Sequence, residues 1–167
     1  IKDFNNSNPL SFHLTTYCDA PKGSGLGASS TMVVSIIKVF CEWMNINLTN
    51  DEIALLAYDI ERKDLNFSGG KQDQYAAVYG GFNIIKFGPK NNVEVKPLKI
   101  NTNIINELES NLLLFYTGQS RTSSIIIDQQ VNALKNASNE YLQYMFNLKR
   151  DALKMEEILV EGKLKEF

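Results

Sequence analysis

The spacing of apolar and polar positions in the first third of the chain predicts a strand followed by two helices. Residues 11–18 alternate imperfectly between apolar and polar side chains and contain β-forming residues, which favours a strand. Residues 28–43 repeat apolar side chains at three- and four-residue intervals, the period of a helix with one buried face. Thr49 and Glu52 form a capping-box sequence, which predicts that a second helix begins there and runs to about Lys63. The apolar faces consist of Met32, Ile36, Val39, Phe40 and Trp43 in the first helix and Ile53, Leu56, Ala57 and Ile60 in the second.

Shorter elements follow. Residues 67–70 contain two glycines and predict a turn, and residues 71–79 predict a short helix. Two stretches rich in β-forming residues, 82–87 and 93–97, flank a Gly, Pro and Asn loop, a pattern typical of a β-hairpin.

The pattern becomes mostly helical beyond residue 98, which favours a domain boundary there. We expect a first domain over 1–97 and the beginning of a second over 98–167. A short apolar run at 111–116 is consistent with a buried strand. The helices expected in this part are a weak one at 103–110, one from 123 to about 136 that opens after the polar loop 118–124, and one over 139–167.

Composition narrows the class of protein. The 167 residues are 44% hydrophobic and 22% charged, with a net charge of −2, so a core can form and nothing favours nucleic acid or acidic membranes in general. Cys18 and Cys41 are too few for a disulfide scaffold, and His13, the only histidine, is interpreted as structural. No apolar run approaches the ~20 residues that span a bilayer, and no signal peptide is evident, so the expected location is the cytoplasm.

A glycine-rich loop lies between the first strand and the first helix. Gly23, Gly25 and Gly27 permit positive φ and close approach of the backbone to a ligand. Their N–H groups, with those of the first helical turn and the helix dipole, can converge on an anion. The hydroxyls of Ser29 and Ser30 lie at the same place, and the segment therefore predicts a phosphate site.

Three other interpretations of this loop differ in strength. A Walker A loop fails because Ala28, and not Lys, follows Gly27. The spacing of Gly23, Gly25 and Ala28 fits a loose dinucleotide fingerprint, but the residues after the helix are too few and too polar for the required second strand, with its acidic residue ~20 positions on. A glycine-rich turn with a serine N-cap and no ligand remains open.

The loop resembles the ATP-binding motif of the GHMP kinases, which is Pro-x-Gly-x-Gly-Leu-Gly-x-Ser-Ser at residues 21–30. A second stretch, Gly-Gly-Lys-Gln-Asp-Gln-Tyr-Ala-Ala at 69–77 followed by Gly80 and Gly81, is similar to the catalytic segment of the sugar-specific members. It looks most like that of the D-glycero-D-manno-heptose 7-phosphate kinases. The resemblance implies an α+β fold with two domains, a ribosomal protein S5 domain 2-like part and a ferredoxin-like part.

The resemblance also implies roles for individual residues. Ser29 and Glu61 would hold Mg²⁺, a role for which Glu52, Asp59 and Asp64 are the nearby competitors. The ATP-binding residues would be Lys22, Gly23, Ser24, Gly25, Leu26, Gly27, Ala28, Ser29 and Ser30.

The remaining roles concern catalysis and the sugar. Asp73, twelve residues after Glu61, is the expected catalytic residue, which orients the attacking hydroxyl and accepts its proton or only stabilises the developing charge. Lys71 would neutralise the transferring phosphoryl group or reach a phosphate of the substrate. Arg121 suits recognition of the substrate's phosphate, and Gln72 and Gln74 are expected to contact the sugar.

The implied function is ATP-dependent phosphorylation of the anomeric hydroxyl of heptose 7-phosphate, on a route to GDP-heptose and surface polysaccharide. An anomeric kinase for an unphosphorylated sugar such as fucose, and a nucleotide-binding module without catalysis, remain alternatives. The family's upstream strand with its basic motif and its C-terminal Gly-rich motif are not in the sequence, and the chain begins without Met. We therefore expect a central fragment that is inactive by itself; a homodimer is left open.

Overall fold

The structure is a computed structural model that describes residues 10–21, 23–116, 118, 123–135 and 139–167. It divides into two compact units, one of Ile1–Gly80 with Gly118–Ser124 and one of Gly81–Thr117 with Ile125–Phe167. The longer segment of the first unit thus ends at Gly80. The domain boundary that the sequence predicts after Pro97 stays a prediction.

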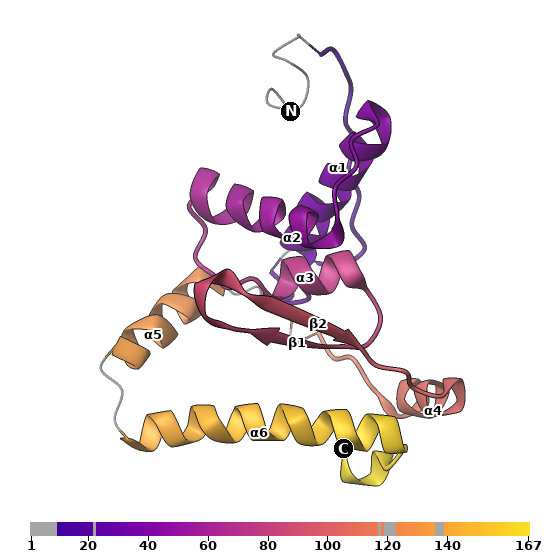
Figure 1. The fold of residues 1–167 in the computed structure, drawn as a ribbon, viewed down its shortest axis with the longest axis vertical. Coiled ribbons are helices and arrows are strands. Elements are labelled where there is room, and N and C mark those ends of the chain that lie inside the picture. The colour runs from indigo at the N-terminus through magenta and orange to yellow at the C-terminus, as the bar shows by residue number, and fades with distance from the viewer. Residues whose placement is uncertain (1–9, 22, 117, 119–122, 136–138) are drawn as a thin grey trace. The chain divides into compact units, whose positions relative to one another are not determined.

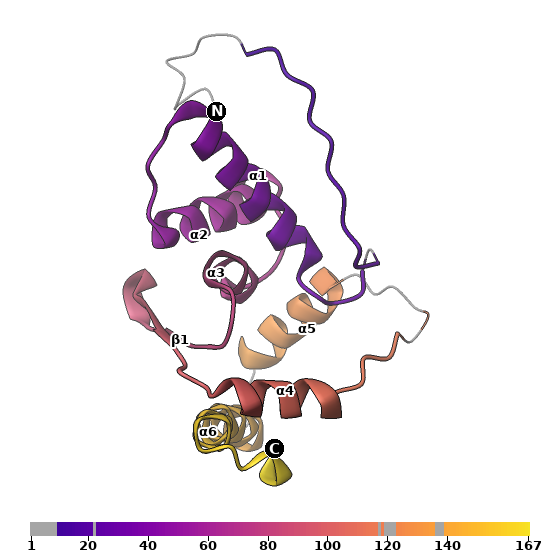
Figure 2. The ribbon, with the colours of Figure 1, turned by 90° about the vertical axis from the view of Figure 1, so that its right-hand side faces the viewer.

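Three mutually packed helices form the first unit (Figures 1 and 2). They are α1 (Ala28–Met44), α2 (Asn50–Asp59) and α3 (Gln72–Tyr79), and all three were predicted. The predicted capping box at the start of α2 is present, with Thr49 and Glu52 exchanging side-chain and backbone hydrogen bonds. The buried apolar residues of this unit are Val34, Ile37, Phe40, Ile53, Ala54, Ala57, Tyr75 and Val78.

The helix that follows Thr49 does not stay α-helical to its end. After Asp59 it becomes a five-residue π-helical turn, η2 (Ile60–Asp64), in which the Leu65 N–H donates to the Ile60 carbonyl over 3.0 Å. Short π-helical segments inside helices often occur at functional sites. This turn carries Glu61, one of the expected site residues, into the interior.

The predicted strand at residues 11–18 is wrong. These residues form no ladder with any other described residue, and a strand requires a partner for its backbone groups. The segment instead packs on α1: the ring of Phe12 lies edge-on 5.1 Å from Phe40 and 5.9 Å from Trp43. Farther along, its residues Leu14–Cys18 and α1 line a cavity of about 240 Å³.

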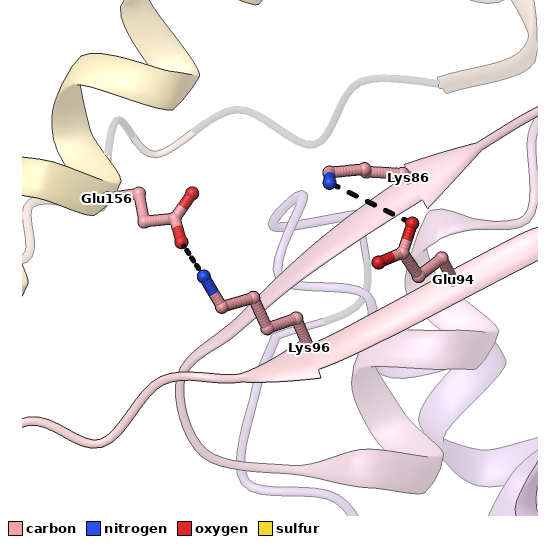
Figure 3. A network of polar contacts seen from close by, with 4 residues as sticks. All are labelled: Lys86, Glu94, Lys96 and Glu156. Atoms are coloured by element: carbon pink, nitrogen blue, oxygen red, sulfur yellow. Dashed lines mark hydrogen bonds and ion pairs between the residues drawn. The ribbon is translucent and has the colours of Figure 1, made fainter.

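The second unit contains the predicted hairpin. Strands β1 (Asn83–Phe87) and β2 (Val93–Pro97) pair antiparallel with Ile85 opposite Val95, and a 3-10 turn, η3 (Pro89–Asn91), connects them. Figure 3 shows two ion pairs: Lys86 faces Glu94 across the hairpin at 3.8 Å, and Lys96 reaches Glu156 at 2.7 Å. Glu156 raises the pKa of Lys96 by its hydrogen bond and its charge.

Helices complete the second unit. They are α4 (Thr102–Asn111), α6 (Asn139–Glu161) and the 3-10 turn η4 (Leu164–Glu166), with Leu108, Ile158 and Leu159 buried. The end of α6 is set by Gly162, whose φ is +72° and where a Cβ would lie 2.8 Å from Cδ1 of Ile104. Helix α5 (Ser123–Lys135) belongs to the first unit through its first two residues and to the second through the rest.

The predicted buried strand at residues 111–116 is also wrong. Asn111 ends α4, and the run from Leu112 to Tyr116 is irregular, with each side chain between 56% and 81% exposed. Among the described residues no strand lies beside this run, so its backbone has no strand to pair with. The part of the chain that the structure describes contains no helix long and apolar enough to cross a membrane.

Candidate functional site

The glycine loop has the backbone conformation that a phosphate site requires. Gly23, Gly25 and Gly27 have φ of +74°, +78° and +70°, a region that other residues rarely adopt. Gly27 is the N-cap of α1, and no side chain caps the helix. In the part of the chain that the structure describes, no side chain caps the first N–H groups of α1, which leaves them suited to bind an anion.

Ser29 and Ser30 do not cap α1, whose N-cap is Gly27, so the serine N-cap of the alternative interpretation is wrong, whereas its lack of a ligand is not tested by the structure. Ser29 donates from its hydroxyl to Oε1 of Glu61 over 3.0 Å, and Ser30 donates to Oε2 over 2.7 Å. Both hydroxyls thus point toward a carboxylate from η2, 32 and 31 residues away in the sequence.

Glu61 is the centre of a buried polar cluster. Its side chain is 2% exposed, and Gln74, with no exposed surface, donates to the same Oε2 and, over 3.1 Å, to the Ser30 hydroxyl. Gln74 Oε1 has no hydrogen-bond partner among the described residues. Three donors therefore fix the Glu61 carboxylate with Oε1 toward Ser29, much as outer partners orient a ligand in metal sites.

The competing acids have other partners or positions. Asp59 pairs with Lys63 at 2.7 Å, and Glu52 accepts hydrogen bonds from Thr49, which lower its pKa. Asp64 is exposed and lines a separate cavity between α1 and α2. Of the four acids considered from the sequence, Glu61 is the one that meets Ser29.

The donor chemistry of this pair fits Mg²⁺. Neighbouring oxygen ligands of an octahedral Mg²⁺ are about 3 Å apart, because each lies at roughly 2.1 Å from the ion. Ser29 Oγ and Glu61 Oε1 are 3.0 Å apart, and Ser29 is exposed. No group of three or more His, Cys, Asp or Glu side chains in the described ranges could hold a metal, so phosphate oxygens or water would have to complete this coordination.

Asp73 lies directly beside the glycine loop. A Cβ built on Gly27 would be 3.7 Å from Cγ and 3.8 Å from Oδ1 of Asp73. The Asp73 side chain is exposed, in the first turn of α3, so it can meet a ligand. The structure therefore places the Asp73 carboxylate next to the glycine loop, a proximity that spacing along the sequence does not reveal.

The other expected site residues divide into three groups. Gln72 is exposed beside Asp73. Lys71 is the N-cap residue of α3, and its ammonium lies 5.0 Å from the Tyr58 ring centroid. The expected sugar contact of Gln74 stays a prediction, but in this conformation its buried amide positions Glu61 and Ser30. Lys22 and Arg121 lie outside the described residues.

Three details were not anticipated. Nothing in the sequence pairs Ser30 and Gln74 with Glu61, except that Gln74 is the neighbour of Asp73. His13, interpreted as structural, is exposed in the segment beside α1. The hydroxyl of Ser24 is buried without a partner among the described residues.

Several known proteins are similar to this chain in sequence. Residues 1–81 match the family described as the GHMP kinases N terminal domain. The chain is 48% identical to the D-glycero-alpha-D-manno-heptose 7-phosphate kinase of Campylobacter jejuni over 159 residues, which is 95% of this chain and 46% of that protein. It is 32% identical over 131 residues to the bifunctional fucokinase/GDP-fucose pyrophosphorylase of Arabidopsis thaliana, covering 75% of this chain and 12% of that one.

A solved structure has the same fold. The crystal structure of a D-glycero-D-manno-heptose 1-phosphate kinase from Bacteroides thetaiotaomicron superposes with a TM-score of 0.72 at 44% identity, over 87% of this chain and 41% of that one. The chain therefore spans less than half the length of each of these relatives.

Proposed function

Because this chain carries the N-terminal domain of the GHMP kinases, we propose that the complete protein is a sugar kinase of the heptose kinase type, using ATP. The observation that carries the proposal is the Asp73 carboxylate beside Gly27, at the mouth of α1. The expected phosphate-binding loop and a carboxylate that can accept a proton then lie next to each other.

The chemistry assigned to the chain is positioning and proton transfer. The free N–H groups at the start of α1 bind the ATP phosphates, helped by the helix dipole. Asp73 orients the sugar hydroxyl and accepts its proton as the new bond from oxygen to the γ-phosphorus forms and the bond to the ADP oxygen breaks. Lys71, two residues before Asp73, offers a positive charge for the transferring group.

Ser29 and Glu61 are proposed to hold Mg²⁺. When bound, the ion would neutralise negative charge on the ATP phosphates. The role of Ser30 and Gln74 is to keep the Glu61 carboxylate turned toward Ser29.

The proposed substrate is D-glycero-D-manno-heptose 7-phosphate, phosphorylated at its anomeric hydroxyl to heptose 1,7-bisphosphate with release of ADP. The similarity to a relative named for this substrate supports it. Arg121 is proposed to bind the distal phosphate, and Gln72, exposed beside Asp73, the sugar.

Fucose is the second candidate substrate. It is favoured by the similarity to the fucokinase of Arabidopsis thaliana and to an L-fucokinase of Bacteroides fragilis, which is 28% identical over the whole of this chain. Fucose has no phosphate, so an enzyme that acts on fucose needs no basic side chain to bind a phosphate of the sugar.

A steady-state assay of the complete protein with heptose 7-phosphate, unphosphorylated heptose and fucose separates these functions. We expect the highest kcat/KM with heptose 7-phosphate and a product with two phosphorus resonances. Equal kcat/KM for heptose with and without the 7-phosphate would refute the phosphorylated substrate. ATP binding without turnover of any sugar would refute the kinase and favour a nucleotide-binding module.

A further inference from the structure

The turn that leads into α3 is held by the side chain of Arg62, a residue for which no role was predicted from the sequence. Its Nη1 donates to the carbonyl of Phe67 over 3.4 Å, and its Nη2 donates to the carbonyl of Gly70 over 3.2 Å. The backbone adds a bond from the Phe67 N–H to the Glu61 carbonyl at 2.9 Å. One guanidinium therefore spans the turn from its start to its end.

The fit around this guanidinium is close. A Cβ on Gly69 would lie 2.5 Å from Arg62 Nη2 and 2.7 Å from its Cζ, so only glycine permits the approach. The Tyr58 ring centroid is 5.9 Å from Arg62 Cζ and 5.0 Å from Lys71 Nζ, within the range of cation–π attraction. The ring of Tyr58 thus connects the guanidinium to the residue that caps α3.

Asp73 lies between two anchored positions. Three residues before it, the Gly70 carbonyl is bound by Arg62; one residue after it, the Gln74 amide is bound to Glu61. The two anchors, Glu61 and Arg62, are consecutive residues of η2, and their partners lie on either side of Asp73 in the sequence. The π-helical turn therefore holds both ends of the segment that carries the Asp73 carboxylate.

We propose that Arg62 is a positioning residue for phosphoryl transfer: by holding the Phe67 and Gly70 carbonyls it fixes the first turn of α3 and hence Asp73. The inference rests on the proposed function and deepens it. Arg suits this task because its planar fork carries several donors in fixed directions, whereas Lys presents one compact charge and cannot span both carbonyls with defined geometry. A displacement of a catalytic group by ~1 Å can lower a rate about 100-fold.

The test uses three variants of the complete protein: Arg62→Met, Arg62→Lys, and the control Lys63→Met. Lys63 is the next residue and an exposed cation that pairs with Asp59. The measurements are kcat and the KM for ATP and for the sugar, well below the melting temperature, and amide hydrogen exchange over residues 70–75.

We expect Arg62→Met to lower kcat by about 10- to 100-fold with the KM for ATP changed less than about threefold, since the phosphate loop is untouched. Exchange at 70–75 should become faster, Arg62→Lys should recover part of kcat, and Lys63→Met should stay within about twofold of the wild type. A merely stabilising residue would instead lower the melting temperature without separating kcat from KM.

If the wild-type protein turns over and Arg62→Met has the same kcat, the inference about Arg62 is overturned but the proposed function is not. A reduced kcat with unchanged exchange at 70–75 would also overturn the inference, because the carbonyl bonds would then not be what holds the turn. Absence of turnover in the wild-type protein would overturn the proposed function, and this inference with it.

Discussion

The variants Glu61→Gln and Glu61→Ala separate two properties of the buried carboxylate, its charge and its capacity to accept hydrogen bonds. Glu61 accepts from Ser29, Ser30 and Gln74 and is 2% exposed. The glutamine variant keeps the size of the side chain and one accepting oxygen but removes the charge. The alanine variant removes the acceptor altogether.

The two substitutions should affect stability very differently. In Glu61→Ala, the buried Ser30 hydroxyl and the Gln74 amide lose their bonds to the carboxylate, although the amide keeps its bond to the Ser30 hydroxyl; each buried donor that loses its acceptor costs about 1–3 kcal/mol, or about 2–6 kcal/mol together at most. In Glu61→Gln, the remaining oxygen still accepts from Ser30 and Gln74, while the new amide donates to Ser29. Each bond weakens by about 1 kcal/mol when the charge is lost, but the desolvation cost of a buried carboxylate, several kcal/mol, is relieved.

Glu61→Gln should therefore lie within about 1 kcal/mol of the wild type, whereas Glu61→Ala should be clearly destabilised. For a domain of this length about 1 kcal/mol corresponds to roughly 2–4 °C of melting temperature, so thermal melting resolves the difference. Turnover should follow the charge instead. At saturating ATP we expect Glu61→Gln to lower kcat by about 100-fold and to require more Mg²⁺.

Two results would refute this reasoning. If Glu61→Gln melts as low as Glu61→Ala, the charge and not the acceptor stabilises the cluster. If Glu61→Gln keeps the wild-type rate and Mg²⁺ dependence, Glu61 has no part in holding the metal.

Three further predictions follow from the same structure. Asp73→Asn should lower kcat by about 100-fold or more while leaving the melting temperature within a few degrees, since the side chain is exposed, and unchanged turnover in a kinetic assay would contradict its role. Gly25→Ala and Gly27→Ala should each cost about 1–2 kcal/mol in backbone strain, but Gly27→Ala also places a methyl in contact with Asp73 and should give the lower kcat; equal kcat values would argue against the position of Asp73. Thr49→Ala should destabilise the protein by about 1 kcal/mol, measured by thermal melting at pH 7. The backbone N–H of Thr49, which this substitution keeps, lowers the pKa of Glu52 in the folded state, and the Thr49 hydroxyl lowers it further. The hydroxyl's stabilisation of the carboxylate is present above the unfolded pKa and is lost as pH falls through the folded pKa, so the melting difference should shrink in part in acid, and a constant one would count against the bond from the hydroxyl to Glu52.

Elements that depend on neighbours in the sequence were predicted well. The helical period gave α1, the Thr49 and Glu52 pair gave the start of α2, and turn residues between two β-forming runs gave the hairpin. Each of these signals is local: a cap, a period or a turn forms within a few residues.

Elements that need a distant partner were not predicted correctly. Residues 11–18 and 111–116 have the composition of strands, yet the first packs on α1 and the second is exposed. β-propensity describes how well a residue fits a sheet, but a strand forms only where another strand offers backbone partners. The π-helical turn at Ile60–Asp64 also lacked a local signal.

The sequence by itself determined the chemistry available to this protein: alternate glycines ahead of a helix, hydroxyls at its first turn, and carboxylates at 61 and 73. Only the tertiary structure decided which of these groups meet. It paired Ser29 with Glu61 and not with the other nearby acids, buried Gln74 against that carboxylate, and placed Asp73 beside Gly27. The physical reason is that residues 13 to 46 positions apart are brought together by the packing of α1, α2 and α3, which spacing along the chain does not encode.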